Sequence, residues 1–79
     1  MPDNHTAQAI LEAVLRLAMD EALILQAKAS LSDEDHGALM AYFSLLELGK
    51  QQAATRALSF IDRELDAFDP YSLLDNQPA

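Results

Sequence analysis

The chain has no cysteine among its 79 residues, which excludes disulfide bonds and thiolate metal sites. A domain of this length buries only about 60% of the surface that its unfolded chain exposes. Such small domains usually need a disulfide, a metal or a partner chain to become stable. Because the first is excluded, we expect the chain to gain the missing burial by associating with a second copy of itself.

Basic residues are also scarce, with five Lys and Arg against thirteen Asp and Glu, a formal net charge of −8. Binding to nucleic acid phosphates or to an anionic membrane surface requires clustered Lys and Arg side chains. The chain has no apolar run near the roughly 18 residues that can cross a membrane, and no basic leader at its start. We therefore expect neither nucleic acid nor a membrane as a partner, and a cytoplasmic location.

Glycine and proline, which interrupt helices, are rare and mostly terminal. Prolines occur at positions 2, 70 and 78, and the only glycines are Gly37 and Gly49. The chain between the terminal prolines consists largely of Ala, Leu, Glu, Gln and Met, which lose little side-chain freedom in a helix. No segment alternates apolar and polar residues as a half-buried strand does. The sequence predicts an all-α fold: an antiparallel helical hairpin over residues 1–69, with helices at about 6–30 and 33–68, and a C-terminal tail over 70–79.

The helix expected over 6–30 has two apolar rows. The first recurs every three or four residues, as in the contact seam of paired helices. Its members are Leu11, Leu15, Ala18, Ala22, Leu25 and Ala29. The second lies beside it and is interrupted by Glu21; its members are Ile10, Val14, Leu17 and Ile24. We interpret the remaining narrow face as solvated; it consists chiefly of Glu12, Arg16, Asp20 and Gln26. An apolar surface this wide exceeds the roughly 100° stripe that one neighbour needs, so we expect more than one neighbour.

The helix expected over 33–68 carries one core face and a second, smaller apolar surface. The core face repeats with a period near 3.6 residues. It comprises Leu39, Phe43, Leu46, Ala54, Ala57, Ile61, Leu65 and Phe68, with Lys50 as the only break. The smaller surface comprises Tyr42, Leu45, Leu48 and Phe60. Gly49 either interrupts the helix or lies inside it, at a cost of about 1 kcal/mol relative to alanine. No capping residue follows it, so we prefer the continuous helix, in which Gly49 allows another backbone to approach closely.

The acidic run Ser32-Asp33-Glu34-Asp35-His36-Gly37 has two interpretations. Ser32 fits an N-cap and Asp35 fits the last position of a capping box, while acids in the first turn favour the partly positive helix start. A metal site is the alternative. The glycine and glutamate of a calcium-binding loop are missing from the required positions, and only His5 and His36 are available for zinc. We therefore expect a helix start, with no metal and no cofactor.

The C-terminal region is acidic, and its charges have no evident structural reason in the sequence. It contains Asp62, Glu64, Asp66 and Asp69. Acids are slightly unfavourable near the end of a helix, which leaves room for a basic partner. The tail after Pro70 contains Tyr71, Leu73 and Leu74, which either fold back on the helices or form a short motif for a partner. We prefer the fold-back.

Catalytic groups are missing as well, since the serines lie in no nucleophile-elbow context and no glycine-rich loop is available for phosphates. We expect a small acidic, non-catalytic interaction protein, such as an adaptor, a regulator or a secretion-type chaperone. We expect it to form a homodimeric four-helix bundle, with the first helix central, and to contact another protein. An acidic inhibitor of a basic or nucleic-acid-binding surface is the alternative. The expected partner and dimer surface comprises Ile10, Val14, Leu17, Ile24, Tyr42, Leu45, Leu48, Gly49 and Phe60.

Overall fold

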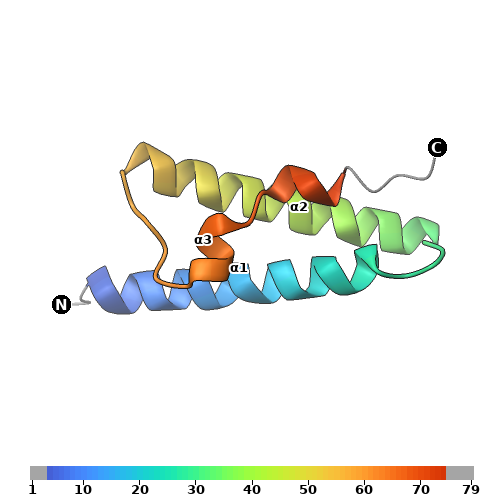
Figure 1. Ribbon diagram of the computed structural model, residues 1–79, viewed down its shortest axis with the longest axis horizontal. Helices are drawn as coiled ribbons and strands as arrows, with labels where there is room; N and C mark the ends of the chain where they lie inside the picture. Colours follow the sequence, from blue (N-terminus) through green and yellow to red (C-terminus); the bar gives the residue numbers. More distant parts are fainter. Residues whose placement is uncertain (1–3, 75–79) are drawn as a thin grey trace.

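Two long antiparallel helices run the length of the molecule in the computed structural model, which describes residues 4–74. Helix α1 spans Asn4–Gln26 and α2 spans Asp33–Thr55, and the two lie side by side (Figure 1). A short helix α3 (Arg63–Ala67) and a 3₁₀ helix η1 (Pro70–Leu73) follow. The described residues form helices and no strand, so the prediction of an all-α helical hairpin is confirmed. Within the described part of the chain, none of the helices has the length and apolar character needed to cross a membrane.

Helix α2 begins as the acidic run predicts. Ser32 is the N-cap: its Oγ accepts a hydrogen bond from the Asp35 N–H at 3.1 Å, and the Asp35 carboxylate accepts one from the Ser32 N–H at 3.1 Å. Lys28, in the turn between the long helices, donates to the same carboxylate at 2.8 Å. The hydrogen bonds from Lys28 and from the Ser32 backbone lower the pKa of Asp35. The run therefore starts a helix through a reciprocal capping box.

The predicted single helix over 33–68 is wrong beyond Thr55. Ala57 takes a positive φ of 53°, and the Leu58 N–H donates to the Ala53 carbonyl at 2.8 Å. This is a Schellman motif, in which glycine usually occupies the left-handed position. Because alanine stands there instead, no glycine or proline in the local sequence marks the break.

Gly49 lies inside α2, so the prediction of an uninterrupted helix at this glycine is confirmed. A Cβ atom at position 49 would lie 2.7 Å from Cδ1 and 2.8 Å from Cδ2 of Leu15 on α1. Gly49 thus permits close approach to α2, as predicted. The group that approaches it is the Leu15 side chain of the same chain rather than another backbone. Helix α1 ends at Gln26, short of the predicted position 30.

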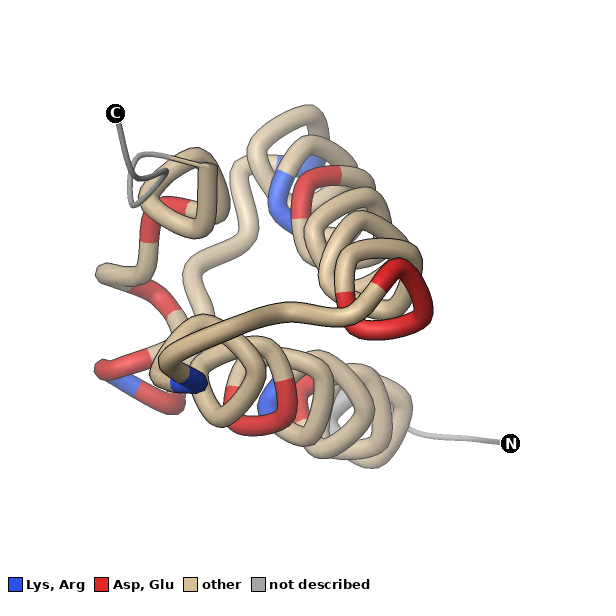
Figure 2. Tube along the Cα trace, turned by 90° about the vertical axis from the view of Figure 1, so that its right-hand side faces the viewer, with Lys and Arg blue, Asp and Glu red and all other residues tan. Residues whose placement is uncertain are grey.

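Residues 58–74, called the C-terminal segment below, fold back along one side of the helix pair (Figures 1 and 2). The predicted fold-back of the tail is confirmed for residues 70–74, in which Pro70 and Leu73 are buried. The rest of the predicted tail, residues 75–79, lies outside the described residues. The domain therefore includes the beginning of what the sequence presented as a tail.

Three aspartates of the C-terminal segment hold its backbone in place. Asp62 is the N-cap of α3 and Asp69 is the N-cap of η1, and each accepts a backbone N–H bond, at 3.2 and 3.0 Å. Asp66 accepts the N–H of Phe60 at 2.9 Å. Asp62 and Asp69 therefore lie at the starts of two short helices rather than near the end of one long helix, and capping is their structural reason. Asp66 instead holds the loop that precedes α3.

The core is one cluster to which both long helices and the C-terminal segment contribute. It comprises Leu15, Ala18, Met19, Ala22, Leu39, Phe43, Leu46, Ala53, Phe60, Leu65 and Leu73. From the predicted seam of α1, Leu15, Ala18 and Ala22 are buried, whereas Leu11 is exposed. The C-terminal segment therefore forms a third layer that covers one side of the hairpin.

Candidate functional site

The side of the hairpin away from the C-terminal segment carries exposed apolar side chains, and we call it the open face. It consists of Ile10, Val14, Leu17, Glu21 and Ile24 of α1, and Leu45 and Leu48 of α2. Their exposed fractions are 62% for Ile10, 50% for Val14, 61% for Leu17, 61% for Ile24, 41% for Leu45 and 54% for Leu48. The structure thus leaves these six predicted surface residues accessible.

Helix geometry explains why these residues share one side. On α1, Glu12 contacts the C-terminal segment, and Val14, two residues further, points about 200° away from it. On α2, the Phe43 ring packs edge-on against Tyr71 of η1, with ring centroids 5.2 Å apart. Leu45 lies two residues beyond Phe43 and again points about 200° away. Both rows therefore face the side of the hairpin that the C-terminal segment leaves uncovered.

Three other residues of the predicted partner surface do not belong to the open face. Phe60 is buried in the core, contrary to the prediction of an exposed surface. It enters the core because the chain leaves α2 before it and folds back. Tyr42 is half-buried and packs against the core cluster, and Gly49 faces Leu15. All three residues are therefore covered from within the chain: Phe60 enters the core with the C-terminal segment, Tyr42 packs against that core, and Gly49 lies against α1.

The narrow polar face of α1, interpreted from the sequence as solvated, holds the C-terminal segment instead. Glu12 is only 8% exposed. Its carboxylate accepts hydrogen bonds from the backbone N–H groups of Ile61 and Asp62, both at 2.9 Å, and from the Gln8 amide at 2.8 Å. Burial raises the pKa of Glu12, but the bonds from Ile61, Asp62 and Gln8 outweigh it and leave the pKa below the ordinary value of 4.5. Glu12 is thus a charged anchor at neutral pH.

Arg16 and Gln26 extend this anchoring along α1. The Arg16 guanidinium donates to both carboxylate oxygens of Asp62 at 3.0 Å and to Glu64 at 3.2 Å. The Gln26 amide donates to the Ser72 carbonyl at 2.9 Å. One face of α1 is therefore used along its length to hold the returning chain.

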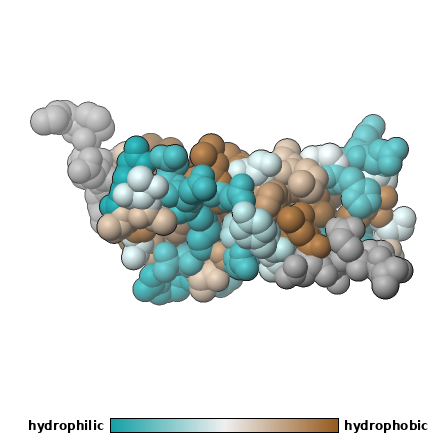
Figure 3. All heavy atoms as spheres, turned by 90° about the horizontal axis from the view of Figure 1, so that it is seen from above, coloured by the Kyte–Doolittle hydropathy of each residue, from teal (hydrophilic) through white to brown (hydrophobic). Residues whose placement is uncertain are grey.

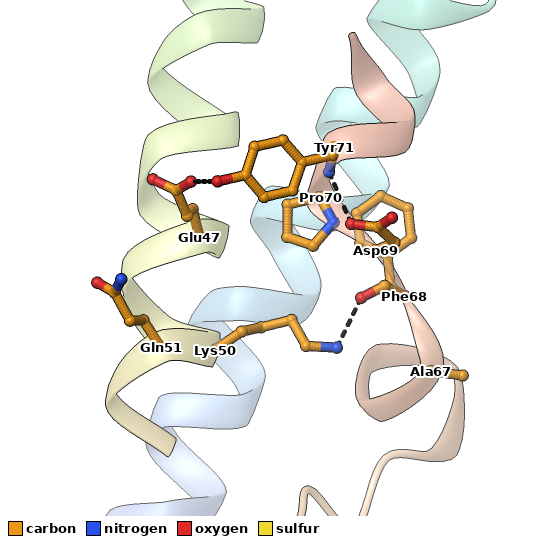
Figure 4. Close-up of a pocket in the computed structure, with 8 residues that line it drawn as sticks. All are labelled: Glu47, Lys50, Gln51, Ala67, Phe68, Asp69, Pro70 and Tyr71. Carbon is orange, nitrogen blue, oxygen red and sulfur yellow. Dashed lines mark hydrogen bonds between the residues drawn. The ribbon is translucent and has the colours of Figure 1, made fainter. Parts of the chain in front are cut away.

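An open cavity of about 500 Å³ lies between α2 and the C-terminal segment (Figure 4). Its lining comprises Glu47, Lys50, Gln51, Ala67, Phe68, Asp69, Pro70 and Tyr71. The Lys50 Nζ donates to three carbonyl oxygens around the end of α3, at 2.6 to 3.1 Å, and so caps that helix. The Tyr71 hydroxyl donates to the Glu47 carboxylate. Lys50 and Glu47 of α2 thus hold the C-terminal segment in place. The polar groups that line the cavity therefore have a structural role.

Charge is distributed unevenly over the described residues. Several acids lie on the C-terminal segment and at the start of α2 (Figure 2). Among the open-face residues named above, Glu21 carries the charge. Seen from above, the surface is a mosaic of hydrophobic and hydrophilic residues (Figure 3). Among the described residues, no three His, Asp or Glu side chains are arranged to hold a metal ion. The feature best suited to recognition is therefore the apolar open face.

Comparisons with models of known protein families, with curated proteins and with solved structures find no match for this chain.

Proposed function

We propose that the protein is a small, non-catalytic interaction module that works through the open face, as an adaptor, a regulator or a secretion-type chaperone. The observation that carries this proposal is the set of six large apolar side chains, four on α1 and two on α2, left accessible on one side of the hairpin. Large contiguous apolar patches are rare on soluble monomers and commonly mark protein contacts. The first partner that we propose is a second copy of the chain, with the open faces packed into a four-helix bundle in which α1 is central.

The size of the open face supports this pairing. Each long helix has 23 residues. Each is therefore about 35 Å long, and two packed helices are about 20 Å wide. The molecule itself measures 47 × 19 × 17 Å along its principal axes. A face of about 700 Å² approaches the roughly 800 Å² that each partner contributes to a stable interface.

The energetic balance favours a weak and reversible dimer. Complete burial of a Leu, Ile or Val side chain contributes about 1.5–3 kcal/mol, so a half-exposed one still has roughly 1 kcal/mol to contribute. Twelve such side chains, six from each copy, contribute about 12 kcal/mol in the dimer. Association costs about 4–15 kcal/mol in lost freedom of motion. We therefore expect a dissociation constant in the micromolar range or weaker.

The acidic-inhibitor alternative has less support from the positions of the acids. Asp62, Asp66 and Asp69 bond to backbone N–H groups of their own segment. In addition, Arg16 pairs with Asp62 and Arg63 pairs with Asp66, at 3.0 and 3.1 Å. These charges have partners within the molecule, so a basic target is not needed to explain them.

Light scattering over a range of concentrations tests self-pairing, with two matched variants. Ile24→Gln removes an isoleucine that is 61% exposed on the open face, and Ile61→Gln removes one that is 64% exposed on the C-terminal segment. A two-fold dimer loses Ile24 twice, roughly 2 kcal/mol in total, so I24Q should weaken the dimer about 30-fold. I61Q should leave the dimer unchanged.

Two results would contradict self-pairing through the open face. One is a wild-type chain that remains monomeric up to about 1 mM, the weak end of measurable association. The other is equal weakening of the dimer by I24Q and I61Q. In the first case a different protein would have to cover the open face, and in the second the dimer would use another surface.

A further inference from the structure

Glu21 interrupts the apolar row of α1. It follows Leu17 by four residues and precedes Ile24 by three, so it lies on the same side of the helix as both. Its side chain is half-buried. Among the described residues, no cation lies within salt-bridge distance of its carboxylate, because the two nearest basic residues in the sequence, Arg16 and Lys28, pair with other acids. The apolar row of α1 therefore carries a charge that this chain leaves without a counter-ion.

Any second copy that covers the open face must meet this charge. Copies that run parallel place two Glu21 carboxylates opposite each other, where like charges repel. Copies that run antiparallel, with Leu17 on the two-fold axis, place each Glu21 one helical turn, about 6 Å, from that axis. There the carboxylate faces the partner's apolar row and loses water without gaining a hydrogen-bond donor. Both arrangements oppose association.

We infer that Glu21 sets the strength of self-association and keeps the pairing of two open faces weak. This inference rests on the proposed function, because it concerns the same face and the same partner. A different occupant, such as an amphipathic helix with Lys or Arg in the middle of its apolar side, would be attracted by Glu21 instead. The effect of removing the charge on self-association therefore identifies which role the residue has.

Sedimentation equilibrium of the full chain provides the test. Glu21→Gln keeps the length of the side chain and removes its charge, and it should tighten the dimer at least about tenfold. Glu64→Gln, in the C-terminal segment on the other side of the hairpin, changes the net charge by the same amount at a side chain that is 76% exposed. It should alter the dissociation constant by less than about twofold, because exposed charges away from the contact are screened.

A third variant and a folding control complete the design. Glu21→Leu also adds apolar area and should tighten the dimer more than E21Q does, while circular dichroism verifies the helical content of every variant. A wild-type dimer that E21Q leaves unchanged or weakens overturns the role of Glu21, and self-pairing then stands without it. If wild type, E21Q and E21L all stay monomeric up to about 1 mM, self-pairing is itself wrong and the role of Glu21 is lost with it.

Discussion

Replacement of Glu12 by glutamine should loosen the C-terminal segment from α1. The buried carboxylate accepts the backbone N–H groups of Ile61 and Asp62, one on each oxygen, both at 2.9 Å. Glutamine has nearly the same shape but only one acceptor oxygen, and its amide nitrogen would face one of these N–H groups. One of the two backbone N–H groups then loses its acceptor. The other still has an acceptor, but that oxygen belongs to an uncharged amide.

The size of this effect follows from the bonds that change. A hydrogen bond to a charged group contributes about 1.5–3 kcal/mol and a neutral one about 0.5–1.5 kcal/mol, while an unsatisfied buried donor costs about 1–3 kcal/mol. We therefore expect E12Q to lower the free energy of unfolding by about 2–4 kcal/mol. A domain of this length has roughly 4–12 kcal/mol in total, so the loss is a large share. The melting temperature should fall by roughly 10–30 °C.

Urea unfolding followed by far-ultraviolet circular dichroism measures this loss at neutral pH. Glu34→Gln makes the same chemical change at an exposed position and should cost less than about 1 kcal/mol. The pH dependence provides a second readout. Because the fold lowers the pKa of Glu12, its stabilisation is fully present above the ordinary value of 4.5 and is lost as the pH falls through the lowered value. The difference between wild type and E12Q should therefore shrink on acidification below pH 4.5.

Two observations would contradict this role of the Glu12 carboxylate. The first is an E12Q variant whose free energy of unfolding lies within about 0.5 kcal/mol of wild type, the range of ordinary surface substitutions. The second is a difference between the two proteins that stays constant across the acidic range. Either result would mean that the carboxylate does not hold the segment after α2.

Three further substitutions concern α2 and the turn that follows it. Ala57→Gly should stabilise the fold by about 0.5–1 kcal/mol. The left-handed conformation costs alanine about 1–2 kcal/mol, and the greater conformational entropy of glycine in the unfolded chain offsets only part of the gain from removing that cost. A lower urea midpoint than wild type would argue against strain at this position. Gly49→Ala should destabilise the fold by about 1 kcal/mol, because its Cβ would meet the buried Leu15 side chain at 2.7 Å. Gly37→Ala, with nothing within 4 Å of the new Cβ, should stabilise by about 0.5–1 kcal/mol. If both alanine variants were stabilised equally in urea, Leu15 would have to relax freely.

The break after α2 was beyond prediction from glycine and proline, but it was not without a signal. Asp62 stands directly before α3, and Asp69 stands directly before Pro70 at the start of η1. Both positions match the preference for Asp at an N-cap and for Pro in the first turn. The amphipathic period of 33–68 hid these caps, because apolar residues recur at helical spacing on both sides of the break. The structure nevertheless leaves Ile61, a member of the predicted core face, 64% exposed.

The open face was predictable in part. The row of Ile10, Leu17 and Ile24 follows from the excess of apolar residues around α1, and the structure leaves these side chains exposed. The excess of apolar residues in the sequence did not indicate which of them other parts of the same chain would cover. Phe60 shows this limit, since the fold-back of its segment carries it into the core.

The sequence by itself determined the helical class, the capped start of α2 at Ser32 and the surplus apolar row of α1, because each depends on residues within one or two turns. Only the tertiary structure decided which side of the hairpin is covered. Glu12, Arg16 and Gln26 meet their partners 46 to 50 residues further along the chain. A local pattern shows that these side chains are polar, but it does not specify which distant backbone group or carboxylate they will bind.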